Sequence, residues 1–152
     1  MVPTLSTPIE TDKEFFGNTM EQMSKLTAEG RVPMSVAGLM QRRLNGGDDE
    51  ATKDFYTDTY FNTGDAIASH PDGRVKIVLD SKDLRAINSD TPLNNGALVL
   101  TEDVYNSLQG EEFKKRSLSK TGDWISKRKV KAHPIWRALA RDQTLLNEYT
   151  DY

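Results

Sequence analysis

The sequence predicts an α+β fold: a small antiparallel sheet that includes a hairpin around residues 65–80, packed with several short helices. Two observations favour this class. A turn motif, "HPDGR", separates two short segments that contain alternating apolar residues, as in a β-hairpin. Elsewhere, apolar residues recur at helical spacing behind capping residues, without a regular alternation of strands and helices.

The chain has 152 residues, of which 36% are hydrophobic, and this suits one compact domain. We expect residues 11–152 to form that domain. Residues 1–10 contain Pro3, Pro8 and little to bury, so we expect an extended N-terminal arm that orders against something else. Such an arm could join the chain to an oligomer or to a larger assembly.

Composition and motifs exclude several classes of function. The absence of cysteine rules out disulfides, thiolate zinc sites and a cysteine nucleophile, and it fits a cytoplasmic protein. The longest aliphatic run, residues 97–100, is too short to cross a membrane, and the first residues lack the pattern of a signal peptide. No Ser-His-Asp order or phosphate-binding glycine loop is present, and we expect His70 and His133 to have structural roles near their prolines.

Local capping signals predict the helices. Thr11 and Glu14 form a capping box for a helix over residues 12–29. Further helices are expected to begin at Ser35, at Asp48 or Asp49, at Ser81 and at Thr101. Asp54 and Asp58 lie one helical turn apart, where two carboxylates could hold a cation. A solvated acidic face is the favoured interpretation, because no further ligand completes the set.

The remaining elements are a strand over residues 97–100 and a last helix that begins at Pro134. The apolar stripe of that helix comprises Ile135, Leu139, Leu146 and Tyr149. The hydrophobic periodicity of all these elements predicts one core. Its expected members are Phe16, Met20, Ile77, Leu79, Val99, Leu139 and Leu146.

The segment "GDAIASHPDGRVKIVLDSKD", residues 64–83, has the strongest turn signal. Pro71 presets φ at the first turn position, and Gly73 accepts the left-handed conformation that closes a three-residue hairpin with a bulge. A loop over residues 71–73 pairs His70 with Arg74, so the numbers of paired residues sum to 144. Ile67 is therefore expected opposite Ile77.

The same segment has a second interpretation. Gly64 and Asp65, then a hairpin, then an apolar strand that ends in Asp80, Ser81 and Lys82, together resemble the PD-(D/E)xK nuclease superfamily. In that superfamily two strand-borne acids bind magnesium and a lysine assists the attacking water. The resemblance implies a Mg²⁺-dependent phosphodiesterase with Asp65 and Asp80 as metal ligands and Lys82 beside the water.

The predicted register argues against a shared metal. Asp65 and Asp80 differ in parity, so a regular hairpin sends their side chains to opposite faces. A bulge between Asp65 and His70 would reset the alternation. The hairpin alone explains the apolar residues and the turn, so we expect no catalytic site and keep the nuclease as an alternative.

Charge is distributed unevenly along the chain. The net charge is −3, yet residues 113–137 contain nine basic residues against Asp123, a net +8, so the rest of the chain carries −11. The candidate anion-binding residues are Lys114, Lys115, Arg116, Lys120, Lys127, Arg128, Lys129, Lys131 and Trp124. Cations interleaved with tryptophan can follow phosphates and stack on bases. The plainer alternative is that the charges are solvated while Trp124 and Trp136 anchor their segments to the core.

Together these patterns favour a non-enzymatic binding or assembly protein, without a cofactor, that contacts an anionic partner through its basic C-terminal segment. Nucleic acid, bound with little sequence preference and strong salt dependence, is the first candidate. An acidic protein surface within a larger assembly is the second. A Mg²⁺-dependent nuclease is the enzymatic alternative.

Overall fold

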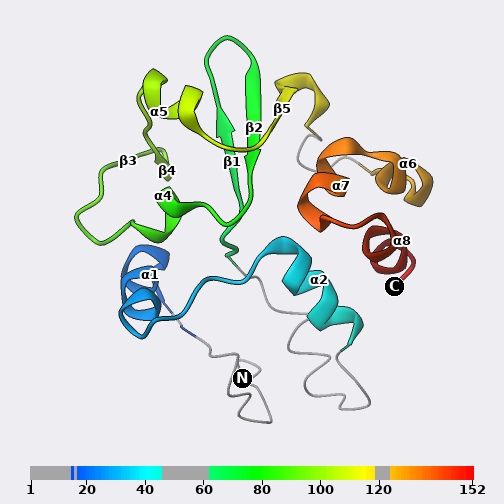
Figure 1. The fold of residues 1–152 in the computed structure, drawn as a ribbon, viewed down its shortest axis with the longest axis horizontal. Coiled ribbons are helices and arrows are strands. Elements are labelled where there is room, and N and C mark those ends of the chain that lie inside the picture. The colour runs from blue at the N-terminus through cyan, green and yellow to red at the C-terminus, as the bar shows by residue number, and fades with distance from the viewer. Residues whose placement is uncertain (1–14, 16, 46–61, 119–123) are drawn as a thin grey trace.

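The computed structural model describes residues 15, 17–45, 62–118 and 124–152, and these form an α+β fold (Figure 1). Several expectations fall outside these ranges. They concern the arm over residues 1–10, the capping box of Thr11 and Glu14, the side chain of Phe16, the helix expected to open at Asp48 or Asp49 with Asp54 and Asp58, and Lys120.

A three-stranded antiparallel sheet carries the hairpin. Strand β1 (Ala66–Ser69) pairs with β2 (Arg74–Val78), and the other edge of β2 pairs with β5 (Glu111–Lys114). Ile67 lies opposite Ile77, so the predicted register is confirmed.

The turn of the hairpin also has the predicted form. The His70 N–H donates to the carbonyl of Arg74 at 2.8 Å, and the Gly73 N–H donates to the carbonyl of His70 at 3.0 Å. Gly73 has a φ of +96°, which glycine adopts without strain. The three residues between His70 and Arg74 therefore close the hairpin.

The alternation of buried and half-buried side chains along β2 ends earlier than the sequence indicated. Val75 and Ile77 are buried, but β2 ends at Val78 and Leu79 enters a turn. Leu79 is 38% exposed, so the prediction that it belongs to the core is wrong.

Two helices precede the hairpin. Helix α1 (Thr19–Ala28) begins after Asn18, whose side chain accepts a hydrogen bond from the Met20 N–H. The helix expected over residues 12–29 is wrong at residues 15, 17 and 18, which are not helical, and Gly17 has a φ of +114° that interrupts the helical conformation. Helix α2 (Val36–Leu44) begins behind the predicted cap at Ser35.

Short elements follow the hairpin. Helices α4 (Lys82–Arg85) and α5 (Glu102–Ser107) begin behind the predicted caps Ser81 and Thr101. Strands β3 (Leu93–Asn94) and β4 (Ala97–Leu98) pair with each other in a separate two-stranded sheet. The strand expected over residues 97–100 is thus shorter, and Val99, expected in the core, is 63% exposed.

The basic segment contains a 3-10 turn, η1 (Lys115–Ser117), and helix α6 (Lys127–Ala132). Two more helices follow α6, namely α7 (Pro134–Ala140) and α8 (Gln143–Asp151). One continuous last helix was expected. Instead Arg141 adopts a left-handed conformation, with a φ of 65°, and Asp142 caps the next helix by accepting from the Leu145 N–H at 2.7 Å.

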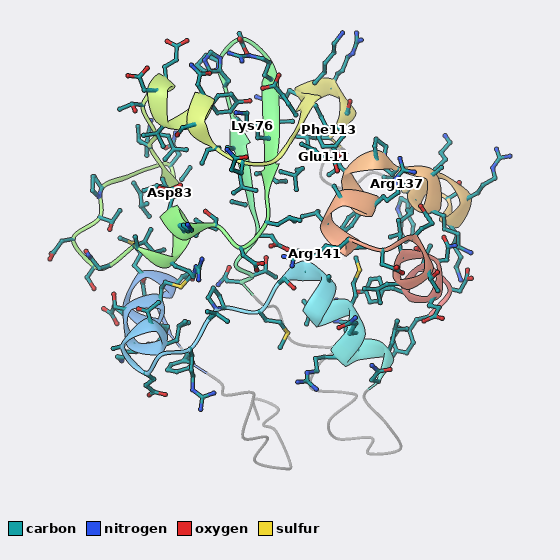
Figure 2. The ribbon with its side chains drawn as sticks, in the orientation of Figure 1. Lys76, Asp83, Glu111, Phe113, Arg137 and Arg141 are labelled. Atoms are coloured by element: carbon teal, nitrogen blue, oxygen red, sulfur yellow. The ribbon has the colours of Figure 1, made fainter. Side chains whose placement is uncertain are left out.

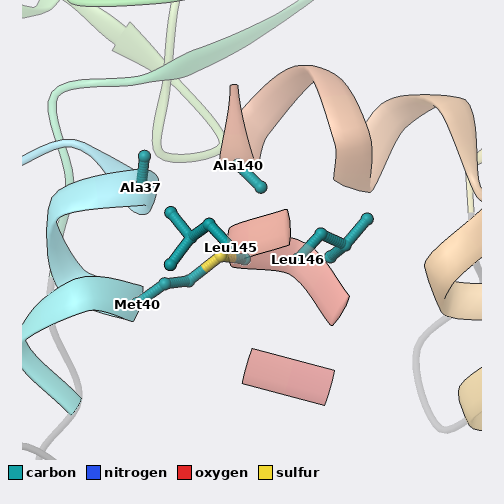
Figure 3. Close-up of a cluster of buried hydrophobic side chains, with 5 residues drawn as sticks. All are labelled: Ala37, Met40, Ala140, Leu145 and Leu146. Atoms are coloured by element: carbon teal, nitrogen blue, oxygen red, sulfur yellow. The ribbon is translucent and has the colours of Figure 1, made fainter. Parts of the chain in front are cut away.

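The core consists of two clusters. The larger joins α2 to the last two helices and contains Ala37, Met40, Ala140, Leu145 and Leu146 (Figure 3). The smaller joins β2 to α7 and contains Ile77, Ile135 and Leu139. Val36 and Trp136 pack against both.

Burial therefore confirms part of the predicted core. Ile77, Leu139 and Leu146 are buried, and Met20 is half-buried. The longest described helix, α1, has 10 residues, and no helix in the described ranges combines the length and apolar character needed to cross a bilayer.

Candidate nucleic-acid interface

Exposed cations lie on β5, on η1 and on α6. We define the basic surface as these six exposed side chains: Lys114, Lys115, Arg116, Lys127, Arg128 and Lys129. Among the residues that the structure describes, no carboxylate forms an ion pair with any of them. Arg137 of α7 is exposed near α6 and adds a further cation (Figure 2).

Helix α7 supports both parts of the basic surface. Phe113 of β5 and Leu118, which follows η1, pack against the cluster that contains Ile135 and Leu139 of α7. Helix α6 contacts α7 directly and packs Val130 against the larger cluster. Figure 1 shows β5, α6 and α7 on the same side of the molecule.

Lys131, another candidate anion-binding residue, has a different environment. Its Nζ lies 2.7 Å from a carboxylate oxygen of Asp151. This hydrogen bond lowers the pKa of Asp151, and the charge of Lys127 contributes to the same shift. Gln143 also donates to the Lys131 carbonyl at 2.8 Å. Lys131 therefore joins α6 to α8, and its charge is neutralised within the protein.

The two tryptophans of the candidate set have different surroundings. Trp136 is half-buried and packs against both core clusters, so it anchors α7 as the plainer interpretation expected. Trp124 is fully exposed, so the expectation that it anchors its segment is wrong. It lies just before Ser126, whose side chain caps α6 by accepting from the Lys129 N–H at 3.3 Å.

The two acids of the nuclease resemblance meet at one guanidinium group. Arg141 Nη2 lies 3.1 Å from Asp65 Oδ1 and 3.1 Å from Asp80 Oδ2. The expectation that the two carboxylates point apart is therefore wrong. The pairing register holds, but Asp80 lies beyond the end of β2 in a left-handed conformation, with a φ of 50°, and this conformation turns its side chain towards Arg141.

Asp65 links α2, the hairpin and Arg141 before α8. We call this set of contacts, made by Asp65 with Val36, Asp80 and Arg141, the joint. Its side chain is 1% exposed, whereas that of Asp80 is 54% exposed. Besides Arg141, Asp65 accepts hydrogen bonds from the Val36 N–H at 2.8 Å and from the Asp80 N–H at 2.9 Å. The carboxylate thereby satisfies a donor in the first turn of α2, where a negative charge is also favoured by the helix dipole.

Gly64 belongs to the same joint. Its N–H donates to the carbonyl of Met34 at 2.9 Å, and its own carbonyl accepts from the Ser81 N–H at 2.8 Å. A Cβ on Gly64 would lie 2.8 Å from Cγ of Pro33, too close for a side chain. The spacing of Gly64, Asp65, Asp80 and Ser81 therefore has a structural explanation.

Chemistry at the joint would need further ligands. Lys82 is exposed at the start of α4. Within the described ranges, no three acidic or histidine side chains gather as a metal site requires. The guanidinium group of Arg141 lies between the two carboxylates, where the resemblance would place a cation.

A second polar cluster, which the sequence reasoning missed, surrounds Tyr105 of α5. The Tyr105 ring is 3% exposed and lies 5.1 Å from the ring of His70, with Arg74 and Lys76 over its face at 5.4 and 4.8 Å. Lys76 Nζ donates to the carbonyl of Tyr105 at 2.8 Å. Burial raises the pKa of Tyr105, and the carboxylate of Glu112 raises it further.

Both histidines make local contacts beside their prolines. His70 Nδ1 lies 2.9 Å from Asp72 Oδ1 in the hairpin turn, and His133 Nδ1 accepts from the Ile135 N–H at 3.3 Å at the start of α7. Desolvation would raise the pKa of Asp72, but hydrogen bonds from the backbone and side chain of Arg74 outweigh it and lower that pKa.

Comparison with family models, with curated proteins and with solved structures finds no match to this chain. Function is therefore inferred from the residues and their geometry.

Proposed function

We propose that this protein binds nucleic acid, with little sequence preference, through the basic surface, and that its role is binding rather than catalysis. The observation that carries the proposal is that, among the described residues, no carboxylate pairs with the six cations of the basic surface, which form two runs of three consecutive residues in a chain whose acids outnumber its bases, 23 to 20. Several other cations of the described residues do pair with carboxylates. Examples are Arg31 with Glu29, Arg74 with Asp72, Lys131 with Asp151 and Arg141 with Asp65.

Like charges held close together repel one another, and a polyanion relieves that repulsion by bringing a phosphate to each cation. Lysine and arginine contacts to phosphates carry no sequence information, so they support affinity without specificity. The affinity should fall in the range of about 10⁻⁴–10⁻⁶ M at physiological salt, as for other non-specific complexes.

The proposal is tested with two double variants of equal charge change. R128Q/K129Q removes one arginine and one lysine from the basic surface, and K25Q/R31Q removes one of each from α1 and the residues that follow it. Binding to a labelled oligonucleotide is measured by fluorescence anisotropy at low salt. We expect R128Q/K129Q to weaken binding and K25Q/R31Q to leave it within experimental error.

Equal weakening by both variants would contradict the proposal, since it would show a response to net charge rather than to the basic surface. Absence of binding by the unmodified protein at low salt would also contradict it. In that case an acidic protein surface, in a larger assembly, becomes the partner to test. Circular dichroism of each variant confirms that it is folded.

A further inference from the structure

Trp124 is a large apolar side chain fully exposed to water, and the residues that follow it lead directly into α6. The half-buried Ile125 follows it, and Ser126 then fixes the start of α6 through its hydrogen bond to the Lys129 N–H. A single exposed apolar residue is ordinary in itself. Its position directly before the consecutive cations Lys127, Arg128 and Lys129 is what separates Trp124 from the other exposed apolar residues.

We propose that the basic surface takes single-stranded nucleic acid in preference to duplex, and that Trp124 stacks on one of its bases. This inference rests on the proposed function. Lys127 is three positions after Trp124, so their Cα atoms lie no more than about 11 Å apart. An indole and a cation at that separation can engage the base and the phosphates of the same strand.

Single strands differ from duplexes in the surface that they offer to an indole. In a duplex each base face is covered by its neighbours, so a surface tryptophan meets base edges and backbone. In a single strand the bases can unstack and present a full face to an aromatic ring, whatever their identity. Trp124 would therefore add affinity for single strands without adding sequence preference, while the cations serve both forms.

The test compares Trp124→Ala, Trp124→Phe and a matched control, Val99→Ala, which truncates an exposed apolar residue on another segment. The probes are labelled oligothymidylate, labelled oligouridylate and a labelled hairpin duplex of mixed sequence. For Trp124→Ala we expect both single strands to bind about 5-fold to about 150-fold more weakly, the range for loss of one stacked base, with the duplex affinity unchanged. Trp124→Phe should retain part of the affinity, and Val99→Ala should retain all of it.

Tryptophan fluorescence gives an independent readout. Saturating unlabelled oligothymidylate should quench the emission of the unmodified protein, and the quenching should disappear in Trp124→Phe, because the remaining Trp136 is packed against the core. If Trp124→Ala binds single strands as tightly as the unmodified protein, or weakens duplex equally, this inference is wrong. The proposed function would still stand if R128Q/K129Q weakened both probes.

Discussion

Replacing Asp65 by asparagine tests the joint between α2, the hairpin and the corner that precedes α8. Asparagine keeps the shape of the side chain but removes its charge and turns one acceptor oxygen into a donor. The Asp65 carboxylate accepts from three groups: the Val36 N–H, the Asp80 N–H and the Arg141 guanidinium. After substitution at least one of these donors faces another donor.

The expected loss of unfolding free energy follows from how deeply each hydrogen-bond partner of Asp65 is buried. The bond to the Val36 N–H is partly buried, so its loss costs about 1–3 kcal/mol. The Asp80 N–H is exposed and Arg141 is 36% exposed, so water replaces much of what they lose, and together they add roughly 1 kcal/mol. We therefore expect Asp65→Asn to lower the free energy of unfolding by about 2–4 kcal/mol.

Asp80→Asn is the matched control, because it makes the same chemical change at the other carboxylate on Arg141. Asp80 is exposed, and asparagine tolerates its left-handed backbone, so the expected loss is below about 1 kcal/mol. Urea unfolding, followed by tryptophan fluorescence, reports both variants. With a slope of about 1.5 kcal/mol/M, Asp65→Asn should lower the midpoint by roughly 2 M. Equal, small shifts for both variants would refute the assignment of Asp65 as the centre of the joint.

Three further predictions concern other parts of the molecule. The raised pKa of the Tyr105 hydroxyl means that the folded state keeps a proton that the unfolded state loses near the ordinary tyrosine pKa of 10.0, so stability should fall as the pH rises beyond that value. Tyr105→Phe should therefore show a smaller fall in urea midpoint between pH 8 and about 10.5 than the unmodified protein. An identical fall in both proteins would contradict this prediction. Gly110→Ala places a Cβ against the carbonyl of Ile77 and should lower the free energy of unfolding by about 1–3 kcal/mol. Circular dichroism should show this as a lower melting temperature. An unchanged melting temperature would contradict the close contact between Gly110 and the Ile77 carbonyl. We expect no Mg²⁺- or Mn²⁺-dependent cleavage of DNA or RNA, and cleavage that disappears in both Asp65→Ala and Asp80→Ala with folding intact would establish the nuclease alternative.

The sequence predicted the features that depend on neighbouring residues. The hairpin was predictable because the turn residues, including Gly73, fix its loop length and therefore its register. The helix starts behind Ser35, Ser81 and Thr101 were predictable because a cap needs one side chain and a donor three residues later.

Features that depend on distant contacts were not predictable in the same way. Strand β5 pairs with β2 from more than thirty residues away, and its sequence, "EEFK", lacks the alternation of a half-buried strand. The break at Arg141 places a non-glycine residue in a left-handed conformation, which periodicity does not indicate. Asp142 was an available signal, because aspartate before an apolar run is a typical helix cap.

In the candidate site too, features set by neighbouring residues were predictable and features set by distant contacts were not. The exposure of the cations at residues 114–116 and 127–129 agrees with their sequence pattern, because charged side chains remain in water unless a partner compensates them. The different surroundings of Trp124 and Trp136 depend on which segment packs against α7 and β2, and no local signal distinguishes two tryptophans in one basic segment. Arg141 was missed because its partners come from the hairpin, far away in the sequence.

The salt dependence of oligonucleotide binding tests the central claim most directly. The logarithm of the association constant for a single strand falls with the logarithm of salt concentration with a slope of about −0.7 per neutralised phosphate. R128Q/K129Q should therefore reduce the magnitude of that slope by about 1.4 relative to the unmodified protein, while K25Q/R31Q should leave it unchanged. An equal slope for the unmodified protein and R128Q/K129Q would contradict the assignment of the basic surface as the nucleic-acid interface.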